Sequence, residues 1–182
     1  MGLNKVTNND GTSIRIGEVR FSYPRFFEPN PETKKYSCCI LIDKDNKEAL
    51  DLIEKAVAIA AKKGAEKFWK GKIPANLAKP LHDGDDEKPD DEAYFNCFYL
   101  NCSNTYAPQV VIKKDDLGLV AADERDVYPG CYGAITLSFF PYDNSGHRGV
   151  GVSLGNVIKL RDGERLAGTV ESAEASFADL AD

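Results

Sequence analysis

The stretch CYGAITLSFFPYDNSGHRGVGVSLGNVIKL, residues 131–160, decides the fold class of this chain. Its two halves are rich in β-branched and aromatic residues, and residues 144–146 (NSG) between them are typical of a tight turn. We therefore expect strands over 131–143 and 147–160 that pair as an antiparallel hairpin. The close-set glycines of residues 149–156 indicate a bent, closely packed strand, since no helix follows that could hold a phosphate at its N-terminus.

The first half of the chain carries two more strand patterns. Residues 13–23 (SIRIGEVRFSY) change the phase of their apolar residues near Gly17, which predicts a strand with a bulge. Residues 36–43 (YSCCILID) predict a mostly buried strand. Because only a proline-rich loop separates the two, we expect them to form a long hairpin.

One helix is predicted between these strands and the second half. Asp45 can cap it, with Glu48 at capping-box spacing, and Gly64 can end it in a left-handed conformation. Its apolar stripe would consist of Leu50, Ile53, Val57 and Ala60. A single amphipathic helix among strands indicates a cap or plug on a sheet.

The second half is rich in strand patterns. Residues 93–104 and 109–114 predict two strands joined by a turn at 106–108, and residues 159–166 predict another hairpin around an Asp162-Gly163 turn. About six strands, with no helix between successive ones in this half, indicate a mainly β fold, an antiparallel barrel or sandwich. With 182 residues, of which 42% are hydrophobic, we expect one domain.

The five cysteines show no C-x-x-C pair, and therefore neither a disulfide framework nor a zinc knuckle is indicated. A metal site built from Cys97, Cys102, Cys131 and His147 is conceivable, but buried reduced thiols are the better account. We expect no metal and no cofactor. We also expect no membrane contact and a cytoplasmic location, because there is no long apolar run and no signal-peptide core.

The net charge of −6 is unevenly distributed. Residues 83–92 hold seven acids and one lysine, and the chain after Arg165 holds four acids and no cation. These two segments carry −6 and −4, so the rest of the chain carries +4. A mildly basic body can attract a polyanion, because the local field matters more than the total charge.

The acid run of residues 83–92 lies in an irregular stretch. It fails the EF-hand pattern, because Lys88 stands where that loop needs glycine. A solvated, mobile loop is the expected structure. One alternative function is a metal-dependent nuclease using Asp83, Asp85 and Asp86, since two-metal phosphodiester chemistry needs clustered acids.

Aromatic residues on polar strand faces carry the functional signal. In residues 135–142 one phase is apolar, while the other places Phe140 and Tyr142 among small hydroxyl residues. Exposed rings interleaved with Lys and Arg suit single-stranded nucleic acid, because every base offers a face to stack and every linkage a charge. The candidate stacking residues are Tyr99, Tyr106, Phe140, Tyr142 and Trp69, although a lone tryptophan is more often part of a core or cap.

The candidate phosphate-binding residues are Lys34, Lys35, Lys113, Lys114 and Arg148. Enzyme motifs are scarce: the chain has two histidines and no P-loop, G-x-S-x-G or H-E-x-x-H motif, so we expect binding without catalysis. A second alternative is a non-enzymatic protein-interaction module, because exposed aromatic residues on β proteins are as often protein-contact patches.

Three segments of the chain resemble a known family. FSYPRFFEPN (21–30), the run VYPGCYGAITLSFFPYDNSGHRGVGVSLGNVIKLRDGERLAG (127–168) and SFADL (176–180) resemble the OB-fold single-stranded-DNA-binding proteins of tailed bacteriophages, first catalogued as a family of unknown function. The resemblance covers most of the chain, and its motifs are structural rather than catalytic. It implies an OB-fold-like five-stranded β-barrel with a helix, sequence-independent binding of single-stranded DNA in phage replication or recombination inside an infected bacterial cell, and a regulatory acidic C-terminus.

We accordingly expect an OB-fold-like domain over residues 1–168 and a flexible acidic tail over residues 169–182. The tail can compete with a polynucleotide for the basic groove. Once displaced, it can dock on a phage or host replication protein. The tip of the tail that would make this contact consists of Phe177, Asp179, Leu180 and Asp182. The sequence leaves open a homo-oligomer.

Overall fold

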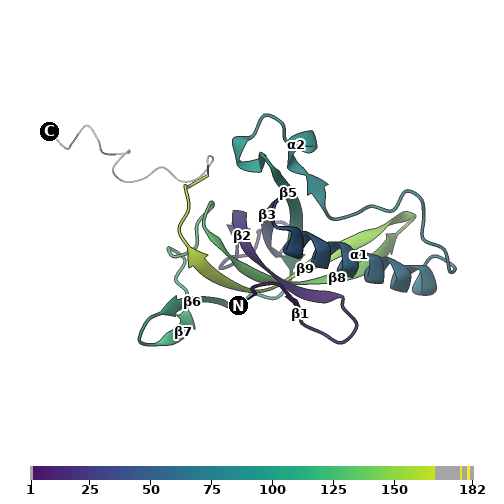
Figure 1. Ribbon diagram of the computed structural model, residues 1–182, viewed down its shortest axis with the longest axis horizontal. Coiled ribbons are helices and arrows are strands. Elements are labelled where there is room, and N and C mark those ends of the chain that lie inside the picture. The colour runs from purple at the N-terminus through teal and green to yellow at the C-terminus, as the bar shows by residue number, and fades with distance from the viewer. Residues whose placement is uncertain (1, 167–176, 178–179, 181–182) are drawn as a thin grey trace.

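The computed structural model describes residues 2–166 together with Phe177 and Leu180 (Figure 1). Its strands are β1 (Lys5–Val6), β2 (Ser13–Arg25), β3 (Tyr36–Asp43), β4 (His82–Asp83), β5 (Cys97–Asn104), β6 (Val110–Lys114), β7 (Gly118–Ala121), β8 (Tyr132–Asn144) and β9 (His147–Arg161). Its helices are α1 (Lys47–Lys67), the short α2 (Gly84–Glu87) and the 3-10 helix η1 (Glu92–Tyr94). Within these residues no helix is long and apolar enough to cross a membrane.

Five strands close into a ring in the order β5, β3, β2, β8, β9. Neighbours in the ring are antiparallel except for the closing pair, in which Ser103 of β5 lies beside Ser153 of β9 in parallel orientation. The ring is uneven, because β8 and β9 pair along most of their length while β5 and β9 pair at one position. The predicted mainly β, OB-like architecture with one main helix is confirmed.

Side-chain alternation along the ring strands builds the core. The inward residues of β3 and β8 are at most 3% exposed: Cys38, Ile40, Ile42, Ile135, Leu137 and Phe139. In β2 the register shifts between Ile16 and Val19, so both of these side chains face the core. The predicted bulge near Gly17 is therefore confirmed.

Helix α1 packs against β2, β8 and β9 along one side of the ring (Figure 1). The side chains buried on this face are mostly small, which allows the helix backbone to approach the strands closely: Ala49, Ile53, Ala56, Ala60, Ala61 and Ala65. Leu50 and Val57 of the predicted stripe pack partly against the same core. The predicted cap on the sheet is thus confirmed.

Both predicted ends of this helix are wrong. The N-cap is Asn46, whose side chain accepts a hydrogen bond from the Ala49 N–H at 3.3 Å. The helix continues through Gly64 to Lys67. The Gly64 carbonyl accepts hydrogen bonds from the N–H groups of Phe68 and Trp69, where the helix ends. Gly64 is needed because Trp69 packs against it.

Two predicted hairpins in the second half are also wrong. β5 and β6 do not pair with each other, since β6 runs parallel to β9 and forms a hairpin with β7. Residues 162–166 form no strand: the Gly163 N–H donates to the Tyr128 hydroxyl, and the Leu166 N–H donates to the Pro129 carbonyl. The end of the described chain therefore packs back on the ring.

The acid run is exposed as predicted, but it contains short regular elements that the sequence pattern did not indicate. Residues 82–94, which we call the acidic flap, contain β4, α2 and η1, and β4 pairs with β5 (Figure 1). Among the described residues, no three His, Cys, Asp or Glu side chains are grouped to hold a metal ion. The cysteines are free thiols, and four of them are buried as predicted.

Candidate nucleic-acid interface

The outer face of β3 and β5 forms an open depression of about 410 Å³. Because alternate residues of these strands point into the core, their other residues point outward. The outward-pointing residues that line the depression are Tyr23, Ser37, Cys39, Asn101 and Ser103. In OB folds the face of the second and third strands binds oligonucleotides, and β3 and β5 are the second and third strands of this ring in chain order.

Tyr23 supplies the exposed ring at this depression, and the sequence pattern missed it. Its apolar phase matches that of the buried Phe21, yet Tyr23 is 66% exposed with a left-handed φ of 49°. The register of β2 against β3 shifts between Ser22 and Arg25, and this shift turns Tyr23 outward. The following Pro24 was the available signal, because proline is confined to strand edges and bulges.

The loop of residues 26–35 brings two predicted cations to the start of β3. The Asn30 side chain accepts hydrogen bonds from two N–H groups of the loop, and the Asn30 N–H donates to the Lys35 carbonyl. Lys34, with a φ of 62°, and Lys35 are both exposed, and neither forms an ion pair with another described residue. They lie three and two residues before Ser37 of the depression.

Tyr106 lies at the same end of the depression. It is 80% exposed, and its N–H donates to the Asn104 side chain at 3.1 Å. Asn104 pairs with Tyr36, the residue that follows Lys35. The turn after β5 therefore carries Tyr106 close to the loop that contains Lys34 and Lys35. The exposure of Tyr106 was predicted from the sequence.

Phe140 and Tyr142 extend the outer face along β8. Phe140 is 43% exposed and lies across Gly151 of β9, while Tyr142 lies across Gly149. A Cβ would lie 2.5 Å from the Phe140 ring at Gly151 and 2.4 Å from the Tyr142 hydroxyl at Gly149. The two glycines let the rings lie close to the sheet, and β9 then leads to Ser153, which adjoins the depression.

The other predicted cations lie at two separate places. Arg148 is exposed near the tip of the β8–β9 hairpin, opposite Asp143. Lys113 and Lys114 are exposed on the β6–β7 hairpin, which Figure 1 shows on the opposite side of the molecule from that tip. Lys34 and Lys35 therefore lie near the depression in sequence, whereas Lys113 and Lys114 lie on a separate hairpin that does not line it.

Tyr99 is not an exposed ring, contrary to the prediction. It is 8% exposed, stacks on His82 with ring centroids 5.1 Å apart, and donates a hydrogen bond to Glu87 at 2.9 Å. Burial and the Glu87 carboxylate raise the pKa of Tyr99 to about 12. Its phase was predicted correctly, but the acidic flap folds over that face of β5.

Trp69 is also buried, at 5% exposure, so it is a packing residue at the end of α1. Its ring contacts Gly64, and its indole N–H has no hydrogen-bond partner among the described residues. The surrounding lysines suggested that Trp69 stacks on bases, but its ring is buried where α1 ends.

Lys44 holds the acidic flap to the end of β3. Its ammonium lies 2.8 Å from Asp83 Oδ1 and 2.7 Å from Asp85 Oδ2. This pairing lowers the pKa of both carboxyls and raises the pKa of Lys44. The acids that suggested a nuclease are thus partly neutralised by a lysine that the sequence reading did not single out.

A cationic cluster that sequence reasoning missed lies around the start of β8 and the end of β9. Arg20 and Arg161 lie over the Tyr132 ring, at 5.4 and 3.7 Å from its centroid. Lys159 and Arg165 lie over the Tyr128 ring, at 5.3 and 4.8 Å.

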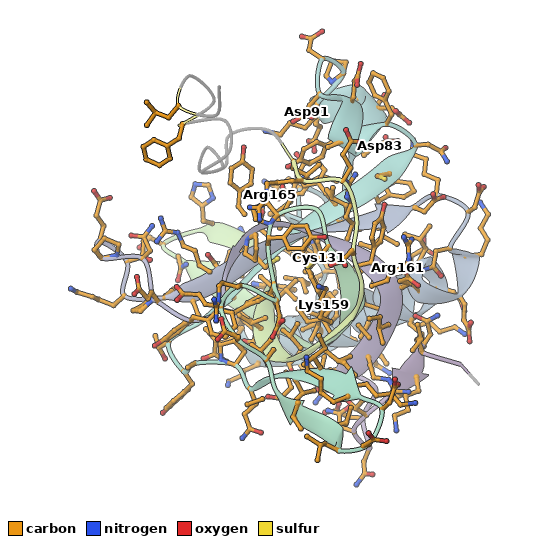
Figure 2. All side chains as sticks on the ribbon, turned by 90° about the vertical axis from the view of Figure 1, so that its left-hand side faces the viewer. Asp83, Asp91, Cys131, Lys159, Arg161 and Arg165 are labelled. Atoms are coloured by element: carbon orange, nitrogen blue, oxygen red, sulfur yellow. The ribbon has the colours of Figure 1, made fainter. Side chains whose placement is uncertain are left out.

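Figure 2 shows Lys159, Arg161 and Arg165 around Cys131, with Asp83 and Asp91 of the acidic flap above them. The burial of Cys131 raises the pKa of its thiol, which disfavours a reactive thiolate.

The chain leaves this region beside the acidic flap. Leu166 packs against a small apolar cluster that contains Cys39, Leu41 and Tyr99. Further on, Phe177 and Leu180 are 60% and 73% exposed. Asp179, Asp182 and the rest of the predicted tail lie outside the described residues, apart from Phe177 and Leu180.

Sequence comparisons find related phage proteins. A protein-family model described as Enterobacter phage Enc34, ssDNA-binding protein, matches residues 12–182. Protein p50 of Acyrthosiphon pisum secondary endosymbiont phage 1 is 32% identical over 176 residues, which cover 92% of this chain and 93% of that protein.

Solved structures share the fold. The single-stranded DNA-binding protein from bacteriophage Enc34 in complex with ssDNA matches with a TM-score of 0.75 and 19% identity, covering 91% of this chain and 94% of that one. Its C-terminal truncation matches with the same TM-score and identity, covering 90% and 98%. The single-stranded DNA binding protein gp2.5 of bacteriophage T7 matches with a TM-score of 0.55 and 16% identity, covering 93% and 94%.

Proposed function

Because the chain belongs to the family of the Enterobacter phage Enc34 single-stranded-DNA-binding protein, we propose that it binds single-stranded DNA on the outer face of its barrel. The family is the one that residues 21–30, 127–168 and 176–180 resemble. The binding is sequence-independent and involves no catalysis. Its setting is phage DNA replication or recombination in the infected bacterial cell.

The observation that carries this proposal is the continuous outer face with rings at both ends. Tyr23 lines the depression of β3 and β5, Tyr106 lies in the turn after β5, and Phe140 and Tyr142 lie on β8 beyond Ser153. Rings that stand free or lie flat on a sheet can stack successive bases whatever their identity. The polar floor between them carries no fixed charge that would repel a phosphate.

Cations at the rim would neutralise the DNA backbone. Lys34 and Lys35 lie at one end of the depression, and Arg148 lies near the tip of the hairpin that carries Phe140. We assign Lys113 and Lys114 to a longer path, because their hairpin pairs with the last third of β9. Each phosphate contact makes binding weaker at higher salt.

The acidic tail of residues 169–182 would compete with DNA for this face. Leu166, three residues before the tail, packs beside Cys39 of the depression, the surface that the four acids of the tail would occupy. After displacement, Phe177 and Leu180 could contact a phage or host replication protein.

Binding of labelled single- and double-stranded oligonucleotides, followed by anisotropy across a salt series, tests the function. The full chain and a truncation ending at Gly168 are compared. We expect both to bind single strands, and the truncation to bind more tightly. If the folded truncation binds no single strand at low salt, the DNA-binding proposal fails, and a protein-interaction module becomes the better account.

A further inference from the structure

The acidic flap covers the continuation of the proposed DNA-binding face. On β5, Tyr99 has the same outward phase as Asn101 and Ser103 of the depression, and on β3, Leu41 has the same phase as Cys39. Tyr99 and Leu41 are 8% and 2% exposed, because Tyr94 and its neighbours pack on them. The open depression therefore ends where the flap begins.

The contacts that hold the flap have the chemistry of nucleic-acid contacts. The His82 ring stacks on Tyr99 with an interplanar angle of 26°, as a base stacks on a tyrosine. The carboxylates of Asp83 and Asp85, which follow it in the chain, hold the Lys44 ammonium as phosphates would.

The flap makes few backbone contacts with the barrel. β4 pairs with β5 at only two positions, and α2 has four residues. The residues from 83 to 92 carry a net charge of −6, which a polyanion entering the same face would repel. Its apolar contact comes from the adjacent Ala93 and Tyr94; Tyr94 lies edge-on to Tyr99, and its hydroxyl lies 3.7 Å from Cys39 Sγ.

We propose that the acidic flap occupies an extension of the single-strand site, and that a DNA strand long enough to pass Asn101 displaces it. In the displaced state a base stacks on Tyr99, and a phosphate takes the place of Asp83 and Asp85 at Lys44. Short strands bind in the open depression and leave the flap in place. This inference rests on the proposed function and adds a second, covered part to the same site.

Two charge-matched variants test it. Asp83→Asn/Asp85→Asn removes the charges that hold Lys44, while asparagine can still accept the hydrogen bonds that these side chains receive from Asp85 N–H and Asn96 N–H. The control, Asp86→Asn/Asp90→Asn, removes the same charge from two exposed flap residues that make no side-chain contact to Lys44 or Tyr99 among the described residues.

For long oligonucleotides we expect the first variant to bind several-fold more tightly than the control, with a salt slope larger in magnitude by about 0.7, the value of one single-strand phosphate contact. Adding Lys44→Met should remove that gain. For oligonucleotides that only fill the depression, the two variants should bind equally. Hydrogen exchange of residues 82–94 in the wild-type protein should rise with the long strand and stay unchanged with the short one.

Equal affinities of the two variants for long strands, or a flap whose hydrogen exchange is unchanged by a long strand, would overturn the inference while leaving DNA binding intact. Absence of binding by the wild-type protein and by both variants at low salt would instead remove the proposed function, and this extension with it.

Discussion

The Phe140 ring lies across Gly151 of the neighbouring strand so closely that a Cβ on this glycine would lie 2.5 Å from Phe140 Cζ. A contact below 3 Å cannot persist, so any larger residue at this position must push the ring away. The absence of a side chain at Gly151 thus lets the Phe140 ring lie on the outer face of the barrel, where the ring is 43% exposed.

Gly151→Ala should weaken single-strand binding as much as Phe140→Ala does, because both changes remove the ring from its position. Loss of one base–aromatic stack costs about 1–3 kcal/mol. Anisotropy titrations measure the loss, and thermal denaturation shows whether each variant is folded. Leu119→Ala, which removes an exposed apolar side chain from β7, is the control and should bind normally. Normal binding by a folded Gly151→Ala protein would mean that the Phe140 ring contacts no base.

The two lysine pairs should differ in the length of DNA at which they act. Lys34→Ala/Lys35→Ala should reduce the magnitude of the salt slope by about 1.4 for short and long strands, at about 0.7 per phosphate contact. Lys113→Ala/Lys114→Ala should act only on long strands, because the β6–β7 hairpin pairs with the end of β9 and does not line the depression. Salt titrations with two oligonucleotide lengths measure both slopes. An effect of Lys113 and Lys114 on the shorter strand would contradict this path.

Local alternation made part of the site predictable. From Leu137 to Asn144 the chain pairs with β9 without a register shift, so the phase of the pattern correctly indicated that Phe140 is exposed and that Phe139 is buried. Tyr106 was equally accessible to prediction, because it lies in a turn whose residues have no sheet to cover them.

Events distant in sequence decided the rest. Tyr23 has the same phase as the buried Phe21, but the register shift in β2 exposes it. Tyr99 points to the outer face as its phase indicates, but the acidic flap buries it. The pairing of β6 with β9 joins residues 47 positions apart, which no local pattern encodes. The acid run was expected to be a solvated loop without regular structure; most of its acids are exposed, but Lys44, 39 residues before Asp83, pairs with Asp83 and Asp85 at the short helix α2.

Gly64→Ala should destabilise the protein even though alanine is the better helix former. A Cβ at this position would lie 2.5 Å from Trp69 Cη2 and 2.6 Å from Pro141 Cβ. Overpacking of this kind costs about 1–3 kcal/mol, which outweighs the roughly 1 kcal/mol that alanine gains over glycine in a helix. Denaturant unfolding measures the difference in the free energy of unfolding.

Two comparisons identify the cause of that loss. Ala58→Gly, at an exposed position of α1, should cost about 1 kcal/mol through helix propensity alone. Trp69→Phe combined with Gly64→Ala should be less damaging than the sum of the two single changes, because the smaller ring leaves room for the new methyl group. Strict additivity would show that Trp69 is not what excludes the alanine.

The Lys44 ion pairs should make part of the stability depend on acid pH. The pKa values of Asp83 and Asp85 are lowered in the folded protein from an ordinary value of 3.8, so their contribution is present above that value and is lost as pH falls through the lowered values. Lys44→Met should therefore lower the Tm at neutral pH, and the difference from the wild-type protein should shrink as pH falls from about 5 to below 3.8. Other carboxylates, including Asp10 with its partner Lys63, titrate in both proteins and do not affect the difference. Melting curves that stay parallel over this range would show that Lys44 does not stabilise the folded flap through these carboxylates.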